Sequence, residues 1–207
     1  MADRLTLQPG LLYVPEALDR AAQRELAEAI AQVIAQAPLF TPVMPRTGKP
    51  FSVRMTNCGP LGWVSDVAGY RYQPLHPESG ENWPPIPEAL LALWRDLAGY
   101  PHPPEACLVN RYEPGTRMGL HQDRDEEDFS APVLSVSLGD TALFRYGGTK
   151  RSDPTRSIKL ASGDAVIIGG ASRLAFHGID RVTAGSSDLL PDGGRINLTL
   201  RRVTKPD

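Results

Sequence analysis

Residues 195–201, with the sequence Arg-Ile-Asn-Leu-Thr-Leu-Arg, alternate polar and aliphatic side chains with a period of two. Successive side chains of a β-strand point to opposite faces of the sheet. The aliphatic residues would therefore share one face and the polar residues the other, with an arginine at each end. Because a buried guanidinium group is tolerated only when it is paired, the segment predicts a strand with one face in the core and an acidic partner on the other.

Short segments of similar character precede this strand from residue 106 onward. Turn sequences rich in glycine and polar residues separate them at residues 147–148, 162–164 and 192–194. Such spacing predicts a mainly β fold with a double-stranded β-helix core, a jelly-roll or cupin-like barrel whose interior can hold a metal and a small ligand. The predicted strands are Cys107–Tyr112, Val133–Leu138, Ala142–Tyr146, Ser157–Leu160, Ala165–Ile168 and Arg195–Arg202.

Two amphipathic helices are predicted in the first half of the chain. Apolar residues recur at helical spacing over Glu16–Gln36 and over Pro87–Ala98, and Gly99 supplies a stop for the second helix. The stretch between them, Thr41–Pro85, is rich in proline and glycine and carries scattered aromatic residues. That composition favours short hairpins and loops. The helices add an α+β character to the fold.

The length of 207 residues fits one domain with a sizeable core. Within it we expect residues 1–105 to supply helices and loops and residues 106–203 to form the catalytic jelly-roll. Cys58 and Cys107 have neither the spacing of a zinc site nor the density of a disulfide framework, which favours a reducing, cytoplasmic setting. No apolar signal segment or membrane-spanning stretch of about 18 residues is found. The net charge of −2 does not indicate a nucleic-acid binder, although cationic residues gather between Arg145 and Arg156.

A candidate metal site lies in Leu120-His121-Gln122-Asp123 and a distant histidine, His177. Two residues apart on a strand, His121 and Asp123 would point the same way. With His177 they would form the ligand set of non-haem Fe(II) oxygenases, two histidines and one carboxylate. An isolated His-x-Asp pair more often belongs to a solvated turn, and the acidic residues that follow are compatible with that alternative. The strands between the two histidines favour the metal site, because a barrel can bring them together.

A dicarboxylate cosubstrate would explain the two arginines of the predicted strand at residues 195–201. In the sequence, this strand follows His177 at the separation that one hairpin would need. 2-Oxoglutarate can chelate iron through one carboxylate and its keto oxygen, and present its second carboxylate to the planar fork of an arginine. Arg195 and Arg201 are both candidates. Asn110 and Tyr112, two apart on a predicted strand, could add neutral hydrogen bonds, or could simply be satisfied residues of the barrel wall.

Further motifs extend these observations. They are Thr56-Asn-Cys-Gly-x-Leu-Gly-Trp63, Gly69-Tyr70, Asn110-Arg-Tyr112, Leu120-His-Gln-Asp-x-Asp-Glu126, Ser135-Val-Ser-Leu-Gly139, Phe144-x-Tyr-Gly-Gly-x-Lys-Arg151, Arg173-x3-His-Gly-Ile179 and Arg195-x-Asn-Leu-Thr-x-Arg201. Together they resemble the AlkB family of alkylation-repair dioxygenases, from about residue 50 to residue 202. The match is close enough to indicate a bacterial member, and the catalytic positions show no departure. The first 50 residues match more loosely.

The resemblance implies a role for each motif residue. It implies Fe(II) ligation by His121, Asp123 and His177; contacts with 2-oxoglutarate by Asn110, Tyr112, Arg195, Asn197 and Arg201; and contacts with the nucleotide by Met55, Trp63, Tyr70, Asp125 and Arg151. Part of residues 1–105 would then be a nucleotide-recognition lid.

The resemblance also implies a reaction. It is oxidative demethylation of bases such as 1-methyladenine and 3-methylcytosine in single-stranded DNA, with O2 consumed, 2-oxoglutarate converted to succinate and CO2, and formaldehyde released. Duplex DNA and RNA are further candidate substrates, and no obligate protein partner is implied. A methylated base inside a duplex must be extruded before it can reach a buried metal. Trp63 could stack on such a base.

Two other functions are compatible with the same residues. One is a 2-oxoglutarate oxygenase that acts on a small molecule or a protein side chain. Such an enzyme would not need the aromatic segment from Trp63 to Tyr70 or the cationic cluster from Arg145 to Arg156. The other is a non-catalytic cupin-like module that holds a metal or an organic acid, which would form no succinate.

Overall fold

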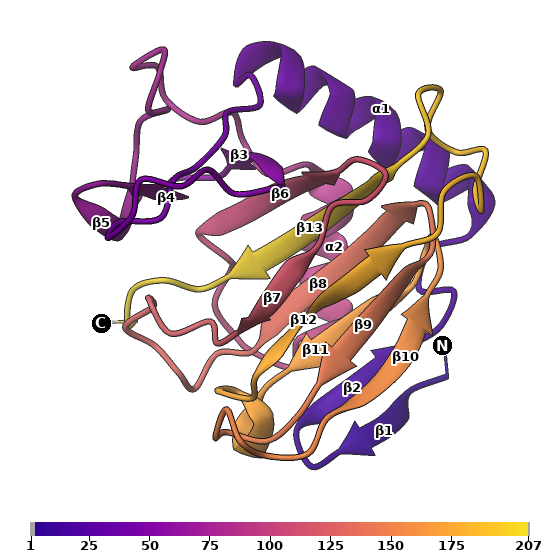
Figure 1. The fold of residues 1–207 in the computed structure, drawn as a ribbon. Coiled ribbons are helices and arrows are strands. Elements are labelled where there is room, and N and C mark those ends of the chain that lie inside the picture. Colours follow the sequence, from indigo (N-terminus) through magenta and orange to yellow (C-terminus); the bar gives the residue numbers. More distant parts are fainter. Residues whose placement is uncertain (1–2, 207) are drawn as a thin grey trace.

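The computed structural model describes residues 3–206 and has three layers: two helices, a seven-stranded sheet and a four-stranded sheet (Figure 1). A separate two-stranded hairpin projects beside the sheets. The strands are β1 Leu5–Gln8, β2 Leu11–Val14, β3 Arg54–Cys58, β4 Gly62–Asp66, β5 Gly69–Gln73, β6 Ala106–Tyr112, β7 Met118–His121, β8 Val133–Gly139, β9 Ala142–Tyr146, β10 Arg156–Leu160, β11 Ala165–Ile168, β12 His177–Val182 and β13 Arg195–Arg201.

The larger sheet has the order β1-β2-β11-β8-β13-β6-β3, and the smaller sheet has the order β10-β9-β12-β7. All of the pairings are antiparallel. The predicted mainly β, jelly-roll fold is confirmed. Strands β1, β2 and β3 belong to the larger sheet, so the first 105 residues contribute to the core as well as to its surroundings.

Strand β13 lies at the centre of this fold and is buried along its whole length. It pairs over seven residues with β6 on one side and with β8 on the other. Its aliphatic residues Ile196, Leu198 and Leu200 pack under the helices. The alternation predicted from the sequence is confirmed, because its polar residues face the space between the two sheets, where they line a cavity.

The helices cover the outer face of the larger sheet. α2 spans Glu88–Leu97, close to its predicted bounds. α1 spans Arg20–Gln36, so its predicted start at Glu16 is wrong by four residues. The side chain of Asp19 accepts a hydrogen bond from the backbone N–H of Ala22 at 2.9 Å and caps the helix there.

The connection between β12 and β13 also differs from the sequence-based expectation. The two strands are not a hairpin, because β12 lies in the smaller sheet and β13 in the larger one. The intervening segment crosses from one sheet to the other. Its path is held by the buried carboxylate of Asp140, which accepts hydrogen bonds from the backbone N–H groups of Gly185, Ser187 and Gly194. His177 and Arg195 therefore lie on different sheets, and both line the cavity between the sheets.

The stretch predicted to contain hairpins and loops holds the hairpin of β4 and β5, which pair only with each other. We call residues 62–73 the lid hairpin. Neither helix within residues 3–206 has the length and apolarity needed to cross a membrane.

Candidate active site

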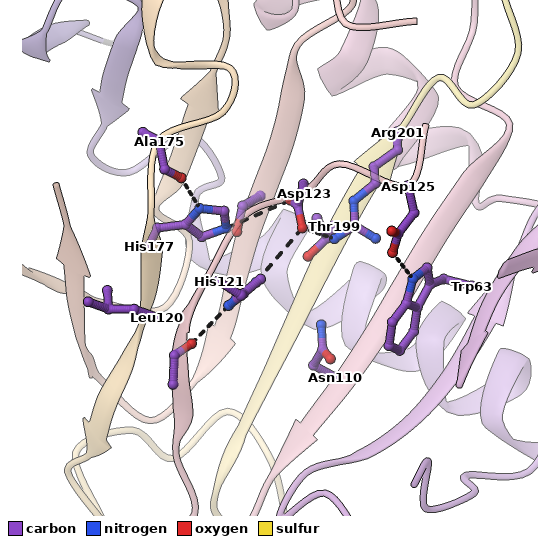
Figure 2. Close-up of polar contacts among 12 residues, drawn as sticks. Trp63, Asn110, Leu120, His121, Asp123, Asp125, Ala175, His177, Thr199 and Arg201 are labelled. Atoms are coloured by element: carbon purple, nitrogen blue, oxygen red, sulfur yellow. Dashed lines mark hydrogen bonds and ion pairs between the residues drawn. The ribbon is translucent and has the colours of Figure 1, made fainter. Parts of the chain in front are cut away.

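The two histidines of the predicted metal site come from neighbouring strands of the smaller sheet. His121 is the last residue of β7, His177 is the first of β12, and the two are register partners. The Nε2 atom of His121 lies 3.8 Å from Asp123 Oδ1, and that of His177 lies 3.7 Å from Asp123 Oδ2 (Figure 2). The ligand atoms of the three residues lie within 4.8 Å of one another. The barrel thus brings distant residues together as expected.

Backbone carbonyl groups orient both imidazole rings. The Nδ1 atom of His121 lies 2.9 Å from the carbonyl oxygen of Gly119, and the Nδ1 atom of His177 lies 3.0 Å from that of Ala175. If each Nδ1 carries the proton, the lone pair on each Nε2 is directed toward Asp123. This is the usual arrangement around histidines that bind a metal.

The position of Asp123 at the site does not follow from strand geometry. Strand β7 ends at His121, so the expectation that the aspartate shares a strand face with this histidine is wrong. The chain turns away after His121, and two arginines then hold Asp123. Arg201 Nη2 donates to its Oδ1 at 2.9 Å, and Arg173 Nη1 donates to its backbone carbonyl at 2.6 Å.

The electrostatics of the three residues suit a cation. Burial raises the pKa of Asp123, but Arg201 and the histidines outweigh burial and hold that pKa well below its usual range. Burial, with the neighbouring His121, lowers the pKa of His177 to about 4. The site therefore offers a carboxylate and a neutral imidazole at neutral pH. The Oδ2 atom of Asp123 is buried without a hydrogen-bond partner within residues 3–206, so the donor set fits a divalent metal ion.

The two arginines of β13 have different surroundings. Arg195 is fully buried and donates only from Nη2, to Ser137 Oγ at 3.0 Å, while its Nε and Nη1 atoms have no partner among the described residues. Burial lowers its pKa to about 10. Burial also lowers the pKa of Arg201, but Asp123 and other neighbours outweigh that effect and raise it. A buried guanidinium with free donors and no acidic partner fits a carboxylate ligand. The Nε atom of Arg201 also lacks a hydrogen bond, but Arg201 is paired with Asp123 and Glu126. Arg195, by contrast, has no ion pair in the described part of the chain.

Polar side chains on adjacent strands continue this surface. Asn110 on β6 and Asn197 on β13 are register partners, and Asn110 Nδ2 donates to Asn197 Oδ1 at 3.3 Å. Asn197 Nδ2 donates in turn to Ser135 Oγ at 2.7 Å. The Oδ1 atom of Asn110 is buried and has no hydrogen-bond partner in the part of the chain that the structure describes. Tyr112 is the register partner of Arg195, and burial raises its pKa to about 12.

The candidate metal ligands, the two arginines of β13 and the polar residues beside them line one cavity of about 490 Å³. Its apolar wall includes Leu108, Leu160 and Ile168, and its polar wall includes the candidate metal ligands. Every residue that the sequence analysis assigned to metal, cosubstrate or nucleotide lines this cavity. They are Met55, Trp63, Tyr70, Asn110, Tyr112, His121, Asp123, Asp125, Arg151, His177, Arg195, Asn197 and Arg201.

The lid hairpin forms one side of the cavity with aromatic side chains. Trp63 on β4 stacks on Tyr70 on β5, with ring centroids 5.5 Å apart and planes 20° apart. Phe51 meets Trp63 edge-on at 6.3 Å. Trp63 Nε1 donates to Asp125 Oδ2 at 2.8 Å (Figure 2). One oxygen of Asp125 is therefore engaged by the lid hairpin.

Of the cationic cluster between Arg145 and Arg156, Arg151 alone is among the residues that line the cavity. Its guanidinium lies 4.9 Å from the centre of the Phe176 ring, and its Nη2 donates to the carbonyl of Leu120 at 3.1 Å. Arg145 instead pairs with Asp180, with Nε 3.3 Å from Oδ1. The cationic cluster seen in the sequence therefore contributes Arg151, but not its other members, to the cavity lining.

The sequence analysis assigned no role to several residues that line or support the cavity. Alternation along β5 could have indicated Tyr72, which lies two residues after Tyr70, whereas no local signal marks the others. They are Phe51, Tyr72, Met118, Gln122, Glu126, Ser137, Arg173 and Phe176.

Comparisons with known proteins agree with this geometry. The sequence profile of the 2OG-Fe(II) oxygenase superfamily matches residues 10–201. The chain is 57% identical over 203 residues to an alpha-ketoglutarate-dependent dioxygenase AlkB homolog of Caulobacter vibrioides, covering 98% of this chain and 92% of that protein. It is 45% identical over 190 residues to alpha-ketoglutarate-dependent dioxygenase AlkB of Escherichia coli K12, covering 90% and 87%. The solved structure of OsALKBH1 superposes with a TM-score of 0.83 at 31% identity, covering 97% of this chain and all of that one.

Proposed function

Because the chain belongs to the 2OG-Fe(II) oxygenase superfamily, and within it to the AlkB alpha-ketoglutarate-dependent dioxygenases, we propose that it repairs N-methylated bases in single-stranded DNA. Its family makes it an Fe(II)- and 2-oxoglutarate-dependent dioxygenase that demethylates alkylated nucleic acids oxidatively. The observation that carries the proposal is the single cavity in which buried, unpartnered polar atoms lie at one end and stacked aromatic rings at the other. RNA is a further candidate substrate.

The metal would be held by His121, Asp123 and His177. Bound Fe(II) would supply the oxidation, in which one oxygen atom of O2 converts 2-oxoglutarate to succinate and CO2 and the other oxidises the N-methyl carbon, which then leaves the base as formaldehyde. The protein supplies position and keeps competing reactions out. The carbonyl groups of Gly119 and Ala175 fix the imidazoles, and Arg201 fixes the carboxylate.

Arg195 would bind the distal carboxylate of 2-oxoglutarate, because it has two free, buried donors and no carboxylate partner among the described residues. The pairing would also offset the desolvation of its charge. Arg201 is already committed to Asp123, so we assign it to the metal end of the cosubstrate. Asn110 Oδ1 and the buried Tyr112 line the same cavity and would contact the ligand between the two arginines.

The methylated base would lie on the Trp63 side of the cavity. A flat aromatic surface accepts any base by stacking, which suits a repair enzyme that meets lesions in many sequences. A single strand presents its bases without the cost of unpairing. Arg151 and Met55 would contribute further contacts with the nucleotide. We also propose that residues 1–105 and 106–203 act as one catalytic unit, since β1, β2 and β3 complete the larger sheet.

The test is formaldehyde release from a single-stranded oligonucleotide that carries 1-methyladenine, with Fe(II), 2-oxoglutarate and ascorbate present. We expect formaldehyde in an amount equal to the increase in succinate over that formed with the unmethylated oligonucleotide, which should itself release no formaldehyde. Succinate without formaldehyde would indicate a different substrate, such as a small molecule or a protein side chain. Absence of both would indicate a binding module.

A further inference from the structure

The lid hairpin touches the loop that follows the metal ligand Asp123 through two side-chain hydrogen bonds. Trp63 donates to Asp125, and Tyr72 donates from its hydroxyl to Glu126 Oε1. Trp63 and Tyr72 are register partners across the hairpin. The two bonds differ in their surroundings, because Asp125 is exposed whereas Glu126 is buried.

Glu126 is the centre of a buried network of charges. Its Oε2 accepts a hydrogen bond from Arg173 Nη2 at 2.9 Å, and its Oε1 lies 3.5 Å from Arg201 Nε. Both arginines also bind Asp123, through its backbone carbonyl and through its Oδ1. The carboxylate that the hairpin tyrosine contacts therefore shares two cations with a metal ligand.

Tyr72 also approaches this network directly. Its hydroxyl oxygen lies 3.5 Å from Arg201 Nη1, whose neighbouring Nη2 binds Asp123. We propose that Tyr72 is a positioning residue that couples the placement of the lid hairpin to the metal and cosubstrate end of the cavity. This inference rests on the proposed function, because it takes 2-oxoglutarate and a methylated strand as the two ligands.

The physical reason is that a buried polar network is sensitive to the loss of one member. If the hairpin moves away, Glu126 loses the hydroxyl donor and Arg201 loses an oxygen near its Nη1, in a site with little water to replace them. Arg201 would then hold Asp123 in place when the hairpin lies where Tyr72 contacts both Glu126 and Arg201. The Trp63–Asp125 bond cannot carry this effect, because Asp125 makes no hydrogen bond or ion pair with Arg173 or Arg201 in the described structure.

Coupling of this kind is reciprocal. If 2-oxoglutarate and the metal favour the docked hairpin, a nucleic acid that binds the docked hairpin must tighten the binding of 2-oxoglutarate by the same factor. Coupling between two sites commonly amounts to a factor of about 5 to 150.

The experiment is calorimetric titration of 2-oxoglutarate into the full chain loaded with Mn(II), which replaces Fe(II) so that no turnover occurs. The titration is done with and without a single-stranded oligonucleotide carrying 1-methyladenine. We expect the oligonucleotide to lower the Kd of 2-oxoglutarate by about fivefold or more in the parent protein, and Tyr72→Phe to reduce this ratio to less than about twofold.

Two matched controls remove the same kind of bond elsewhere. Tyr13 donates to Asp164 at 2.8 Å, and Tyr100 donates to Asp128. Neither carboxylate belongs to the network around Arg201, so Tyr13→Phe and Tyr100→Phe should keep the parent ratio. A parent ratio in Tyr72→Phe, or a parent protein that binds both ligands without coupling, would overturn the inference. A parent protein that binds neither ligand would instead overturn the proposed function.

A second measurement needs no variant. Hydrogen exchange of the β4 and β5 amides is followed in the parent protein with Mn(II), before and after 2-oxoglutarate is added. We expect 2-oxoglutarate to slow exchange in the lid hairpin, since it stabilises the docked position from the opposite end of the network. Unchanged exchange, with 2-oxoglutarate bound, would overturn the coupling even if Tyr72→Phe failed to fold.

Discussion

The cavity has two sides that are built differently. On the side of the larger sheet, β13 pairs with two neighbours over seven residues each, and its site residues are buried. On the other side, β4 and β5 pair only with each other over five residues, and Tyr70 is 50% exposed. Chemistry requires fixed distances, which long ladders provide, whereas recognition requires a surface that can admit a polymer. The difference indicates that substitutions in the sheets should affect turnover of 2-oxoglutarate, whereas substitutions in the lid hairpin should affect affinity for nucleic acid.

The largest effect is expected for the proposed metal ligands, which lie on the smaller sheet and in the loop after β7. His121→Ala, Asp123→Ala or His177→Ala should each abolish turnover of 2-oxoglutarate, because two protein ligands cannot hold the metal in the required geometry. The measurement is succinate formation together with the Kd of Mn(II). His102→Ala, an exposed histidine outside the cavity, is the control. Turnover close to that of the parent in any of the three variants would disprove the assignment of that ligand.

The next effect separates the two arginines of β13. Arg195→Ala should weaken 2-oxoglutarate binding by roughly 3–5 kcal/mol, the cost of removing one partner of a buried charge pair, while the Kd of Mn(II) stays unchanged. Arg201→Ala should weaken both, because Arg201 holds Asp123. Calorimetric titrations of each ligand distinguish the cases. Equal losses of Mn(II) affinity in both variants would contradict the different roles assigned to them.

A smaller effect is expected in the lid hairpin. Trp63→Ala should weaken binding of a methylated single strand by about 1–3 kcal/mol, the usual contribution of one base–aromatic stack. Oxidation of 2-oxoglutarate without nucleic acid should remain largely intact, because Trp63 contacts neither the metal ligands nor Arg195 through a hydrogen bond. Fluorescence anisotropy of a labelled strand gives the affinity. Loss of 2-oxoglutarate oxidation with unchanged strand affinity would identify Trp63 as a structural residue instead.

The same contrast explains which features the sequence predicted. Polar and aliphatic side chains alternate along β13, and Asn110 and Tyr112 share one face of β6. Both are local properties of strands, so they could be predicted. Asp123 lies beside the two histidines as predicted but for a different reason, because its position depends on Arg173 and Arg201 rather than on strand geometry. Such contacts between distant segments leave no periodic signal.

Other features were missed for related reasons. Strands β1 and β2 have four residues each, and both are too short to show a clear alternation. The different surroundings of Arg195 and Arg201 depend on Glu126 and Asp123, which lie in a loop about 70 residues earlier in the chain. The sequence therefore predicted residues that line one cavity, and the structure was needed to distinguish their surroundings.

A modest effect is expected for Asp125, which lies in the loop after β7 and contacts the lid hairpin. 1-Methyladenine and 3-methylcytosine are cationic near neutral pH, whereas 1-methylguanine and 3-methylthymine are neutral. A carboxylate about 4 Å from a cation contributes up to about 4 kcal/mol at an effective dielectric near 20, and less where water screens it. Asp125 is exposed and already accepts a bond from Trp63, so we expect Asp125→Ala to lower kcat/KM for the cationic bases by about tenfold more than for the neutral ones. Equal losses on all four bases would show that Asp125 does not recognise charge.

The smallest effect is on stability, and it tests whether Tyr112, on the larger-sheet side of the cavity, is buried. Burial raises the pKa of Tyr112 from 10.0 to about 12 in the folded protein. Below pH 10 the tyrosine is protonated in both the folded and the unfolded chain, so its contribution is fully present. Between pH 10 and 12 the unfolded chain releases the proton first, and stability is lost as pH rises.

The free energy of unfolding should therefore fall less steeply above pH 10 in Tyr112→Phe than in the parent. Tyrosines such as Tyr13, whose pKa is raised in the same direction by burial and by Asp164, contribute equally to both proteins, so the difference isolates Tyr112. The expected difference is about 1 kcal/mol at pH 11, relative to the difference at pH 8. Urea unfolding of the metal-free protein at both pH values gives it. Parallel curves between pH 8 and 11 would mean that Tyr112 is hydrated and that this end of the cavity is open to water.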